Sequence, residues 1–208
     1  MYLLARQANL RGLDSEKWAV EIGAAAATGL GTDVGVWATV MSPGVGTVTW
    51  TSRWEDLSAV EQGFASVSTD TAYLDLAARG VQFVNGPIND MLYETVYAGN
   101  APSNVATYVG TVSAVCAPGS FGRGMMGGIE IAQSVEKATG VSTEFLAGRT
   151  GPYGTVIWIV GYEDISAYEA AQHALSADMD FVATIDATTG AYQPDSAITQ
   201  ATLHMRLN

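Results

Sequence analysis

Two stretches of the chain, GTVIWIVGYEDISAYEAAQHALSADMDF at residues 154–181 and GTVTWTSRWEDLSAVEQGFASVSTDTAY at residues 46–73, are near copies of each other. They align without a gap at a separation of 108 positions. A period of this length is too long for a solenoid repeat and is typical of a duplicated small domain. Unrelated sequence of this composition would give roughly two identical pairs by chance, whereas eleven are identical: Gly46/Gly154, Thr47/Thr155, Val48/Val156, Trp50/Trp158, Glu55/Glu163, Asp56/Asp164, Ser58/Ser166, Ala59/Ala167, Glu61/Glu169, Ser68/Ser176 and Asp70/Asp178.

The boundary between the two copies falls in the stretch AGNAPSN, residues 98–104. This stretch combines glycine, proline and serine with no hydrophobic periodicity, which is the composition of a linker. We therefore place the linker at residues 99–104, the first repeat at residues 1–98 and the second repeat at residues 105–208.

Each copy reads as strand, helix, strand, strand, helix, strand. Turn residues separate the second and third strands of the first copy, which predicts a hairpin there. Ser58 with Glu61, and Ser166 with Glu169, form the S-x-x-E capping box that is typical of a helix start. The elements expected in the first copy are strands at about 2–10, 33–41, 47–54 and 91–97 and helices at about 14–28 and 57–67, and the second copy closes with a strand at 200–207.

This order of elements predicts an α+β fold of two tandem ferredoxin-like units, each with both helices on one face of an antiparallel sheet. The strand TVIWIV, residues 155–160, is apolar on both of its faces, so the face without helices also needs cover. We expect the sheets of the two copies to pack face to face as an α/β barrel.

Composition excludes several classes of protein. A hydrophobic content of 48% with 14% charged residues is that of a globular chain, and a net charge of −12 disfavours nucleic acid as a partner. Arg6 and Arg11 interrupt the first apolar run, so we expect no signal peptide, no membrane span and a cytoplasmic location. Cys116 is the single cysteine, which excludes an internal disulfide and favours a buried small hydrophobe over a reactive thiol.

A strand leading into ED(L/I)SAxE, then a helix of small residues and S-x-D-x-x-(Y/F), resembles the dimeric α/β-barrel superfamily. Members of that superfamily include antibiotic-biosynthesis-type monooxygenases, muconolactone isomerase-like enzymes, the haem-binding chlorite dismutase-like group and two-unit NIPSNAP-like proteins. The resemblance covers most of both halves, and it implies a fold without supplying a catalytic signature that transfers residue by residue.

The glycine-rich stretch APGSFGRGMMGGIE, residues 117–130, lies between an expected strand and an expected helix. Its amides and Arg123 would suit a phosphate group, but the glycine spacing matches neither of the usual phosphate-binding motifs. A mobile lid or a closely packed helix start at Gly119–Gly128 fits the same residues.

His173 is a second open assignment, because some superfamily members hold haem through a helix histidine. Helical spacing places His173 roughly opposite the inward face of its helix, which favours a solvent or subunit contact. Haem is therefore an alternative cofactor, whereas two histidines and one cysteine at wide separation do not suggest a metal site.

The last strands carry the candidate catalytic residues. In QATLHMRL, His204 and Arg206 share the face opposite Leu203, and with a small register shift Glu94 occupies the corresponding place in the first copy. His204 as a general base with Glu94 as its partner, and Arg53 or Arg206 as anion stabiliser, would form a polar lumen. Alternatively, these polar groups simply satisfy one another or contact water.

The tryptophans suggest an independent site between helices and sheet. Trp37, Trp50, Phe145 and Trp158 would line such a pocket, although aromatic residues at these positions also fit an ordinary core. We expect the protein to bind a small apolar or aromatic molecule, as a cofactor-independent monooxygenase or isomerase. The alternatives are a non-catalytic, self-assembling structural or carrier protein, consistent with a homo-oligomer, and a haem protein.

Overall fold

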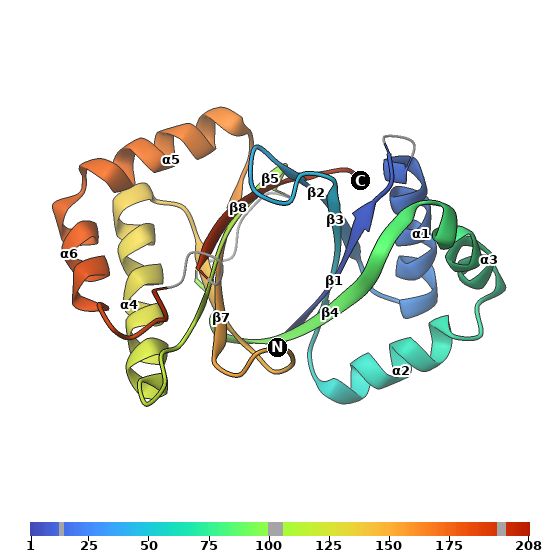
Figure 1. The fold of residues 1–208 in the computed structure, drawn as a ribbon, viewed down its shortest axis with the longest axis horizontal. Coiled ribbons are helices and arrows are strands. Elements are labelled where there is room, and N and C mark those ends of the chain that lie inside the picture. The colour runs from blue at the N-terminus through green and yellow to red at the C-terminus, as the bar shows by residue number, and fades with distance from the viewer. Residues whose placement is uncertain (13–14, 100–105, 195–198) are drawn as a thin grey trace. The chain divides into compact units, whose positions relative to one another are not determined.

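The computed structural model describes residues 1–12, 15–99, 106–194 and 199–208 (Figure 1). Its order of elements is the predicted one, and the short helical piece that the sequence also predicts after Ser68 and after Ser176 is present in both copies. The elements are β1 (Tyr2–Leu10), α1 (Ser15–Leu30), β2 (Val34–Val40), β3 (Thr47–Trp54), α2 (Leu57–Val67), α3 (Thr71–Arg79), the 3-10 helix η1 (Gly80–Gln82), β4 (Val84–Tyr97), β5 (Tyr108–Val115), α4 (Phe121–Thr139), β6 (Thr143–Gly148), β7 (Thr155–Tyr162), α5 (Ile165–Ala177), α6 (Met179–Ala187) and β8 (Gln200–Arg206).

The strands are hydrogen-bonded in the closed order β1-β3-β2-β8-β5-β7-β6-β4. The predicted α+β fold, with antiparallel strands closed into a barrel, is confirmed. The residues form two compact units, Met1–Tyr93 with Met205–Asn208, and Glu94–His204. This division falls within β4 and near the end of β8, whereas residues 100–104 of the expected linker lie outside the described part of the chain. The domain limits 1–98 and 105–208 stay a prediction.

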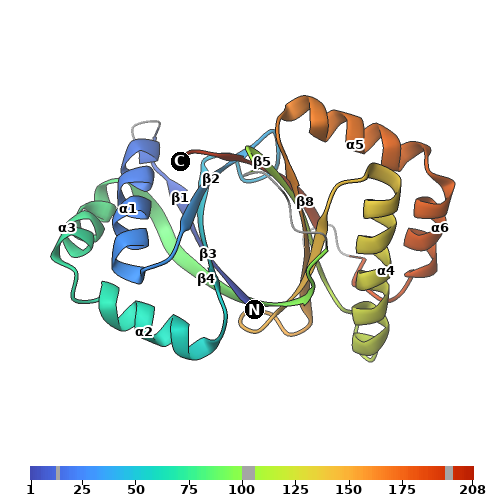
Figure 2. The same cartoon turned by 180° about the vertical axis from the view of Figure 1, so that it is seen from behind.

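In the first unit, β3 is paired with β1 on one side and with β2 on the other. The helices α1, α2 and α3 cover one face of these strands, and α1 packs against both other helices (Figures 1 and 2). The core between helices and sheet contains the buried side chains of Trp18, Ala19, Val36, Val48 and Trp50. Apolar side chains at alternate strand positions and on one face of α1 therefore hold this unit together.

The second unit repeats this arrangement. Here β7 is paired with β5 and β6, and α4, α5 and α6 lie on one face (Figure 2). Ala132, Phe145 and Val156 are fully buried in its core. Lys137 on α4 is ion-paired with Asp180 on α6 at 2.8 Å, and both side chains are exposed, so the pair contributes little to stability.

The residues repeated between the copies hold equivalent structural positions. Gly46 and Gly154 both have positive φ, at 93° and 82°, in the turn before β3 and β7. Val48 and Val156 are both fully buried. The repeated sequence thus encodes turns, core positions and helix starts, which explains why it predicts the fold well and the function poorly.

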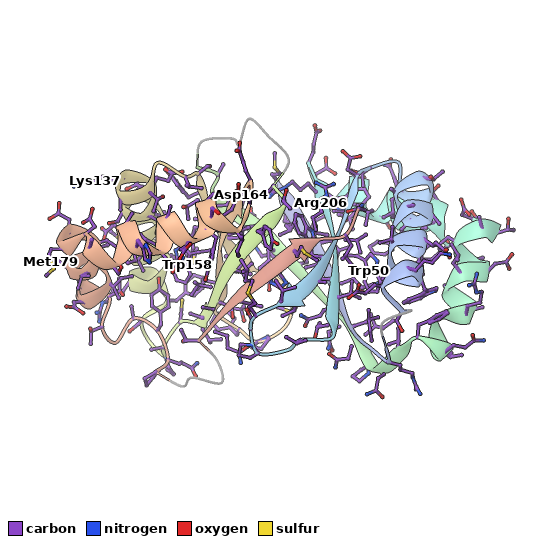
Figure 3. The ribbon with its side chains drawn as sticks, turned by 90° about the horizontal axis from the view of Figure 1, so that it is seen from above. Trp50, Lys137, Trp158, Asp164, Met179 and Arg206 are labelled. Atoms are coloured by element: carbon purple, nitrogen blue, oxygen red, sulfur yellow. The ribbon has the colours of Figure 1, made fainter. Side chains whose placement is uncertain are left out.

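The predicted capping boxes are wrong. The N-cap residues of α2 and α5 are Asp56 and Asp164, whose side chains each accept a hydrogen bond of 2.8 Å from the backbone N–H three residues later (Asp164 is labelled in Figure 3). Ser58 and Ser166 lie inside the first turn and are exposed. A carboxylate at the N-cap also interacts favourably with the helix dipole, which a serine hydroxyl does not.

The glycine-rich stretch is a closely packed helix start. The helix α4 begins at Phe121, so most of the glycines lie within it. A β-carbon at Gly128 would overlap the ring of Phe145, and one at Gly124 would meet the sulfur of Cys116. Arg123 donates a hydrogen bond to the carbonyl of Thr189 at 3.1 Å. Of the three alternatives for this stretch, the packed helix agrees with the structure, because small residues let α4 approach β6.

No helix in the described ranges combines the length and the hydropathy that a membrane crossing requires.

Candidate functional site

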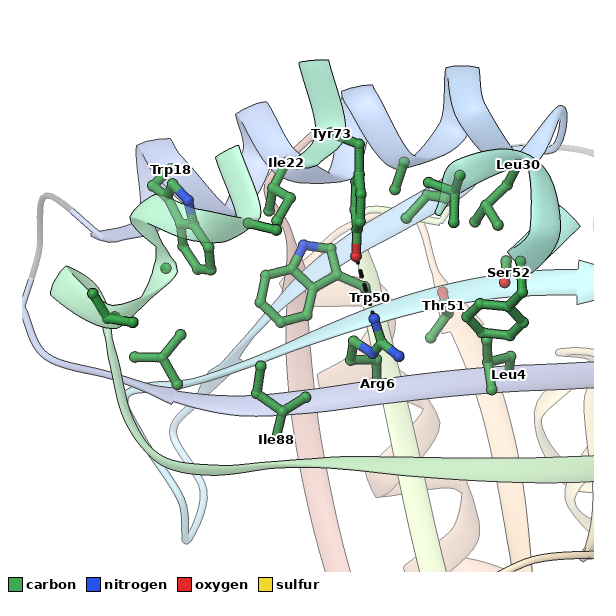
Figure 4. A pocket seen from close by; sticks show the side chains of 18 of the residues that line it. Leu4, Arg6, Trp18, Ile22, Leu30, Trp50, Thr51, Ser52, Tyr73 and Ile88 are labelled. Atoms are coloured by element: carbon green, nitrogen blue, oxygen red, sulfur yellow. Dashed lines mark hydrogen bonds between the residues drawn. The ribbon is translucent and has the colours of Figure 1, made fainter. Parts of the chain in front are cut away.

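A cavity of about 450 Å³ lies within the first unit, between the helices and the sheet (Figure 4). One face of α1 forms its roof through residues spaced four apart, from Trp18 through Ile22 to Leu30. Because these twelve steps rise about 1.5 Å each, the cavity follows the helix for about 18 Å. Most of its walls are apolar, and the apolar residues that line it include Leu4, Trp18, Ile22, Trp50, Phe64 and Ile88.

Two tryptophans are fixed as walls of the cavity. The rings of Trp18 and Trp50 meet edge to face with centroids 5.9 Å apart, and Trp18 also stacks on Phe83 at 5.4 Å. The indole N–H of Trp50 donates to the carbonyl of Ala19 at 2.9 Å, and that of Trp18 to Leu76 at 3.0 Å. Since both indole donors are used within the protein, these rings offer a ligand only apolar surface.

The polar centre of the cavity is a guanidinium beside a phenol. Arg6 projects from β1 beneath Trp50, and Tyr73 projects toward it from α3 (Figure 4). Nη1 of Arg6 donates to the Tyr73 hydroxyl at 3.4 Å, a long hydrogen bond. Asp70 caps α3 by accepting from the backbone N–H of Tyr73 at 2.9 Å, which fixes the start of this helix.

Asp90 holds the Arg6 side chain in place. Nε and Nη2 of Arg6 each donate to one carboxylate oxygen of Asp90, both at 2.7 Å. This bidentate pair raises the pKa of the Arg6 guanidinium, mainly through the hydrogen bonds to Asp90, so Arg6 remains charged. The guanidinium also lies 5.9 Å from the centroid of the Phe64 ring, a cation–π contact.

The second copy lacks this polar pair. The repeat places Phe181 where the first copy has Tyr73. In the strands, Arg6 is paired with Trp50, whereas the residue paired with Trp158 is Val112. The two copies therefore share their fold, and only the first has a charged and a hydroxylated side chain at these positions.

Of the predicted aromatic residues, Trp50 lines the cavity and Trp37 does not. Val36, the neighbour of Trp37, is the residue paired with Trp50, so Trp37 lies on the other face of the sheet. Its indole N–H donates to Thr51 Oγ1 at 2.9 Å, and the Arg206 guanidinium lies 5.6 Å from its ring centroid. Trp37 and Arg206 are thus brought together away from this cavity.

Phe145 and Trp158 belong to the core of the second unit. Their ring centroids are 5.1 Å apart, and Tyr192 meets Trp158 edge-on at 5.5 Å. The indole N–H of Trp158 donates to the carbonyl of Gly128 at 2.8 Å. This cluster corresponds to the core alternative given for these aromatic residues above.

His204 and Glu94 each have another partner. Nε2 of His204 lies 3.4 Å from Thr111 Oγ1, and burial lowers the pKa of His204 to about 4, so the ring is neutral near pH 7. The Glu94 carboxylate accepts hydrogen bonds from Nε and Nη2 of Arg149. A base with so low a pKa is weak at neutral pH. The pairing of His204 with Glu94 as base and partner stays a prediction.

The remaining predicted residues lie at the surface or near the chain end. The Arg53 side chain is exposed, and Nε of Arg206 donates to the backbone carbonyl of Asn208 at 2.7 Å. His173 is exposed on α5, in agreement with its predicted orientation. Among the described residues, no group of three or more histidine, cysteine or acidic side chains is placed to hold a metal ion.

Sequence reasoning missed Arg6, Tyr73 and Asp90. A signal was available for Arg6, because it occupies the core-facing series of β1 between Leu4 and Ala8, where a charge is unusual. Tyr73 is the last residue of the repeated S-x-D-x-x-(Y/F) motif, and its hydroxyl is absent at the matching Phe181. No local pattern indicates Asp90, which is 84 positions from its partner.

Comparison with known proteins supports the fold. No protein-family model matches the chain, and no curated protein matches it in sequence. A putative monooxygenase from Fusobacterium nucleatum subsp. nucleatum is similar in structure, with a TM-score of 0.72 and 14% identity over 100% of this chain and 92% of that one.

Two further solved structures have the same fold. An anthrone oxidase-like protein has a TM-score of 0.65 and 12% identity over 100% of this chain and 91% of its own. A putative chlorite dismutase has a TM-score of 0.54 and 9% identity over 100% and 96%. The chain thus has the dimeric α/β-barrel fold that its sequence resembles, and because proteins named for different reactions share it, the fold does not decide the activity.

Proposed function

We propose that the first-unit cavity binds a small, mostly apolar ring compound that carries an oxygen, and that the protein oxidises this compound with O₂ as a cofactor-independent monooxygenase. The observation that carries the proposal is the Arg6–Tyr73 pair, two hydrogen-bond donors to a ligand oxygen in a mostly apolar cavity. The size of the cavity is within the range typical of small-molecule sites. The similarity to a putative monooxygenase and an anthrone oxidase-like protein supports the same reaction class.

The chemistry follows from the charge on Arg6. A ligand oxygen that accepts from Arg6 Nη1 and from the Tyr73 hydroxyl would be stabilised as an enolate or phenolate, because both donors favour negative charge. Loss of one methylene proton to solvent water gives the enolate, and its former methylene carbon is electron-rich enough to react with O₂ directly. The overall step converts R₂CH₂ and O₂ into R₂C=O and H₂O, so the substrate supplies all the electrons.

Haem does not fit this cavity. Among the residues that the structure describes, its lining contains no histidine, cysteine or methionine, and the one phenol there is hydrogen-bonded to Arg6. The haem alternative would therefore require another site in the chain. A Soret band in the purified protein, with reconstitution by added hemin, is the direct measurement for that alternative.

The experiment for the proposed function uses anthrone, a planar ketone with a reactive methylene. Oxygen consumption and formation of anthraquinone are followed with wild-type protein, with Arg6→Met and with Tyr73→Phe. Arg79→Met and Tyr153→Phe are the matched controls, since both side chains are exposed and outside the cavity. We expect turnover to fall about a hundredfold in Arg6→Met and to stay unchanged in the controls. Equal rates in wild type, Arg6→Met and the protein-free solution would contradict the proposal.

A second candidate is a non-catalytic assembly or carrier protein. It is favoured by large apolar side chains at the surface, among them Met41 at 73%, Val45 at 72% and Tyr153 at 87% exposure, which would suit contacts between copies of the chain. Light scattering distinguishes the two candidates. A large, uniform assembly that consumes no oxygen would favour the assembly protein, and in either case the homo-oligomer is a prediction that this measurement tests.

A further inference from the structure

The charged residues that line the cavity in the described part of the chain are both basic. The chain has 21 acidic and 9 basic residues. Even so, the charged side chains among the described residues that line the cavity are two arginines, Arg6 and Arg11, and no aspartate or glutamate lines it. An acidic protein with a basic cavity is suited to a ligand of negative charge.

The charge of Arg6 is already compensated. Its bidentate pair with Asp90 places a full negative charge 2.7 Å from the guanidinium. Arg6 can therefore orient a ligand oxygen through its remaining N–H donors, while it adds little net positive charge to the cavity.

Arg11 supplies the uncompensated charge. It directly follows β1, where its backbone N–H donates to Phe83 at 2.8 Å and its Nε to the carbonyl of Val84 at 2.6 Å. These bonds hold the guanidinium at the end of the cavity near Trp18, and within the described ranges no carboxylate is paired with it. The residue is exposed, so an anionic group that accepts from its guanidinium could remain partly hydrated.

From this arrangement we infer that the ligand is an elongated apolar carboxylate, whose body lies along α1 and whose carboxylate is bound by Arg11. This inference rests on the proposed function, because it assigns the ligand of the same cavity. Arg11 follows the end of β1 and is five residues after Arg6, so their Cα atoms are at most about 16 Å apart. The ligand thus carries its carboxylate at one end and places a more central atom near Arg6 and Tyr73.

The test compares two probes that differ only in charge, anthracene-2-carboxylate and its neutral carboxamide. Binding to the full chain is measured by fluorescence anisotropy of the probe at constant ionic strength. We expect the carboxylate to bind about five- to tenfold more tightly than the carboxamide, the range for a partly exposed charge-assisted pair. In Arg11→Gln this preference is lost, and the affinity for the carboxamide is unchanged.

Each outcome has a distinct meaning. Arg79→Gln, which removes an exposed arginine outside the cavity, should keep the preference, and retained carboxamide binding shows that Arg11→Gln is folded. Equal affinities of the two probes for the wild type would overturn the inference and leave the proposed function intact. A preference that persists in Arg11→Gln would overturn the role of Arg11. Failure of both probes to bind the wild type would reject the cavity itself and, with it, the proposed function.

Discussion

The hydroxyl of Tyr73 lies 3.4 Å from Nη1 of Arg6, inside a cavity whose other walls are mostly apolar. Arg6 belongs to no recognisable motif, Tyr73 is the last residue of S-x-D-x-x-(Y/F), and the two are 67 positions apart in the sequence. Their counterparts in the second copy are apolar, Val112 by strand pairing and Phe181 by the repeat. At these positions only the first copy therefore has a polar centre.

Replacing Tyr73 by Phe, the residue of the second copy, should lower anthrone oxidation about tenfold. The reason is that one of two donors to the developing oxygen charge is lost, while the ring and its packing are retained. The initial rate at saturating anthrone is the measurement, with Tyr153→Phe as the exposed control. An undiminished rate in Tyr73→Phe would mean that the phenol plays no part in the reaction.

Replacing Asp90 by Asn should increase the preference of the cavity for anions. The change removes the charge that compensates Arg6, so the carboxylate probe gains affinity and the carboxamide probe does not. Because the pair is partly exposed, we expect the free energy of unfolding to fall by less than about 1 kcal/mol. The two affinities and a urea unfolding curve check this prediction, and a weaker preference for the carboxylate would count against it.

The corrected N-caps can be tested by stability. Asp56→Ala and Asp164→Ala should each lower the free energy of unfolding by about 1 kcal/mol, because a backbone N–H at the helix start loses its acceptor. Ser58→Ala and Ser166→Ala should change it by less than about 0.5 kcal/mol, as exposed positions do. Urea midpoints of the four variants are sufficient. If the serine variants lost more free energy of unfolding than the aspartate variants, the predicted capping boxes would be correct after all.

The close approach of α4 to the sheet predicts the effect of Gly128→Ala. The added methyl would overlap the Phe145 ring, so we expect a loss of about 1–3 kcal/mol from overpacking. Gly122→Ala in the same helix meets no atom within 4 Å and should be neutral or stabilising by up to about 1 kcal/mol. In the double variant Gly128→Ala with Phe145→Val, the overlap is removed, and the two losses should not add. Additive losses would contradict the contact.

Because His204 is largely buried, we expect the stability of the protein to depend on pH. Burial lowers its pKa from 6.5 to about 4 in the folded protein, so below pH 6.5 the unfolded chain binds a proton that the folded protein does not. Stability should therefore be complete above pH 6.5 and fall by a few kcal/mol as the pH drops toward 4. His204→Gln should lose this part of the dependence. If NMR instead showed the His204 ring of the folded protein titrating with a pKa near 6.5, the predicted effect of burial would be absent.

His204→Ala separately tests the predicted catalytic base. If His204 removes a proton from the substrate, turnover of anthrone near pH 7 should fall about a hundredfold or more in the variant. Glu94→Gln should then have a smaller effect of the same sign. Unchanged turnover would remove His204 from the mechanism and leave the Arg6–Tyr73 proposal standing, because that proposal needs no histidine.

The sequence by itself determined the elements and the order in which they follow one another. Turn glycines such as Gly46, the core valines and the alternation of β3 act within short windows, so their signal is complete in a few residues. Repetition after 108 positions reinforced each of these signals. The N-caps were predicted wrongly although they are local features. Each helix start offers an aspartate and a serine as possible acceptors, and the aspartate occupies the N-cap position.

Only the tertiary structure decided which side chains meet. Arg6 from β1, Tyr73 from α3 and Asp90 from β4 converge because β1 is paired with β3 in the register that sets Arg6 opposite Trp50. A slip of one residue would turn Arg6 to the other face of the sheet. Trp37 lies on that other face because it is one residue beyond Val36, the partner of Trp50. Register depends on the packing of a whole face against its helices, and no short stretch of sequence contains that information.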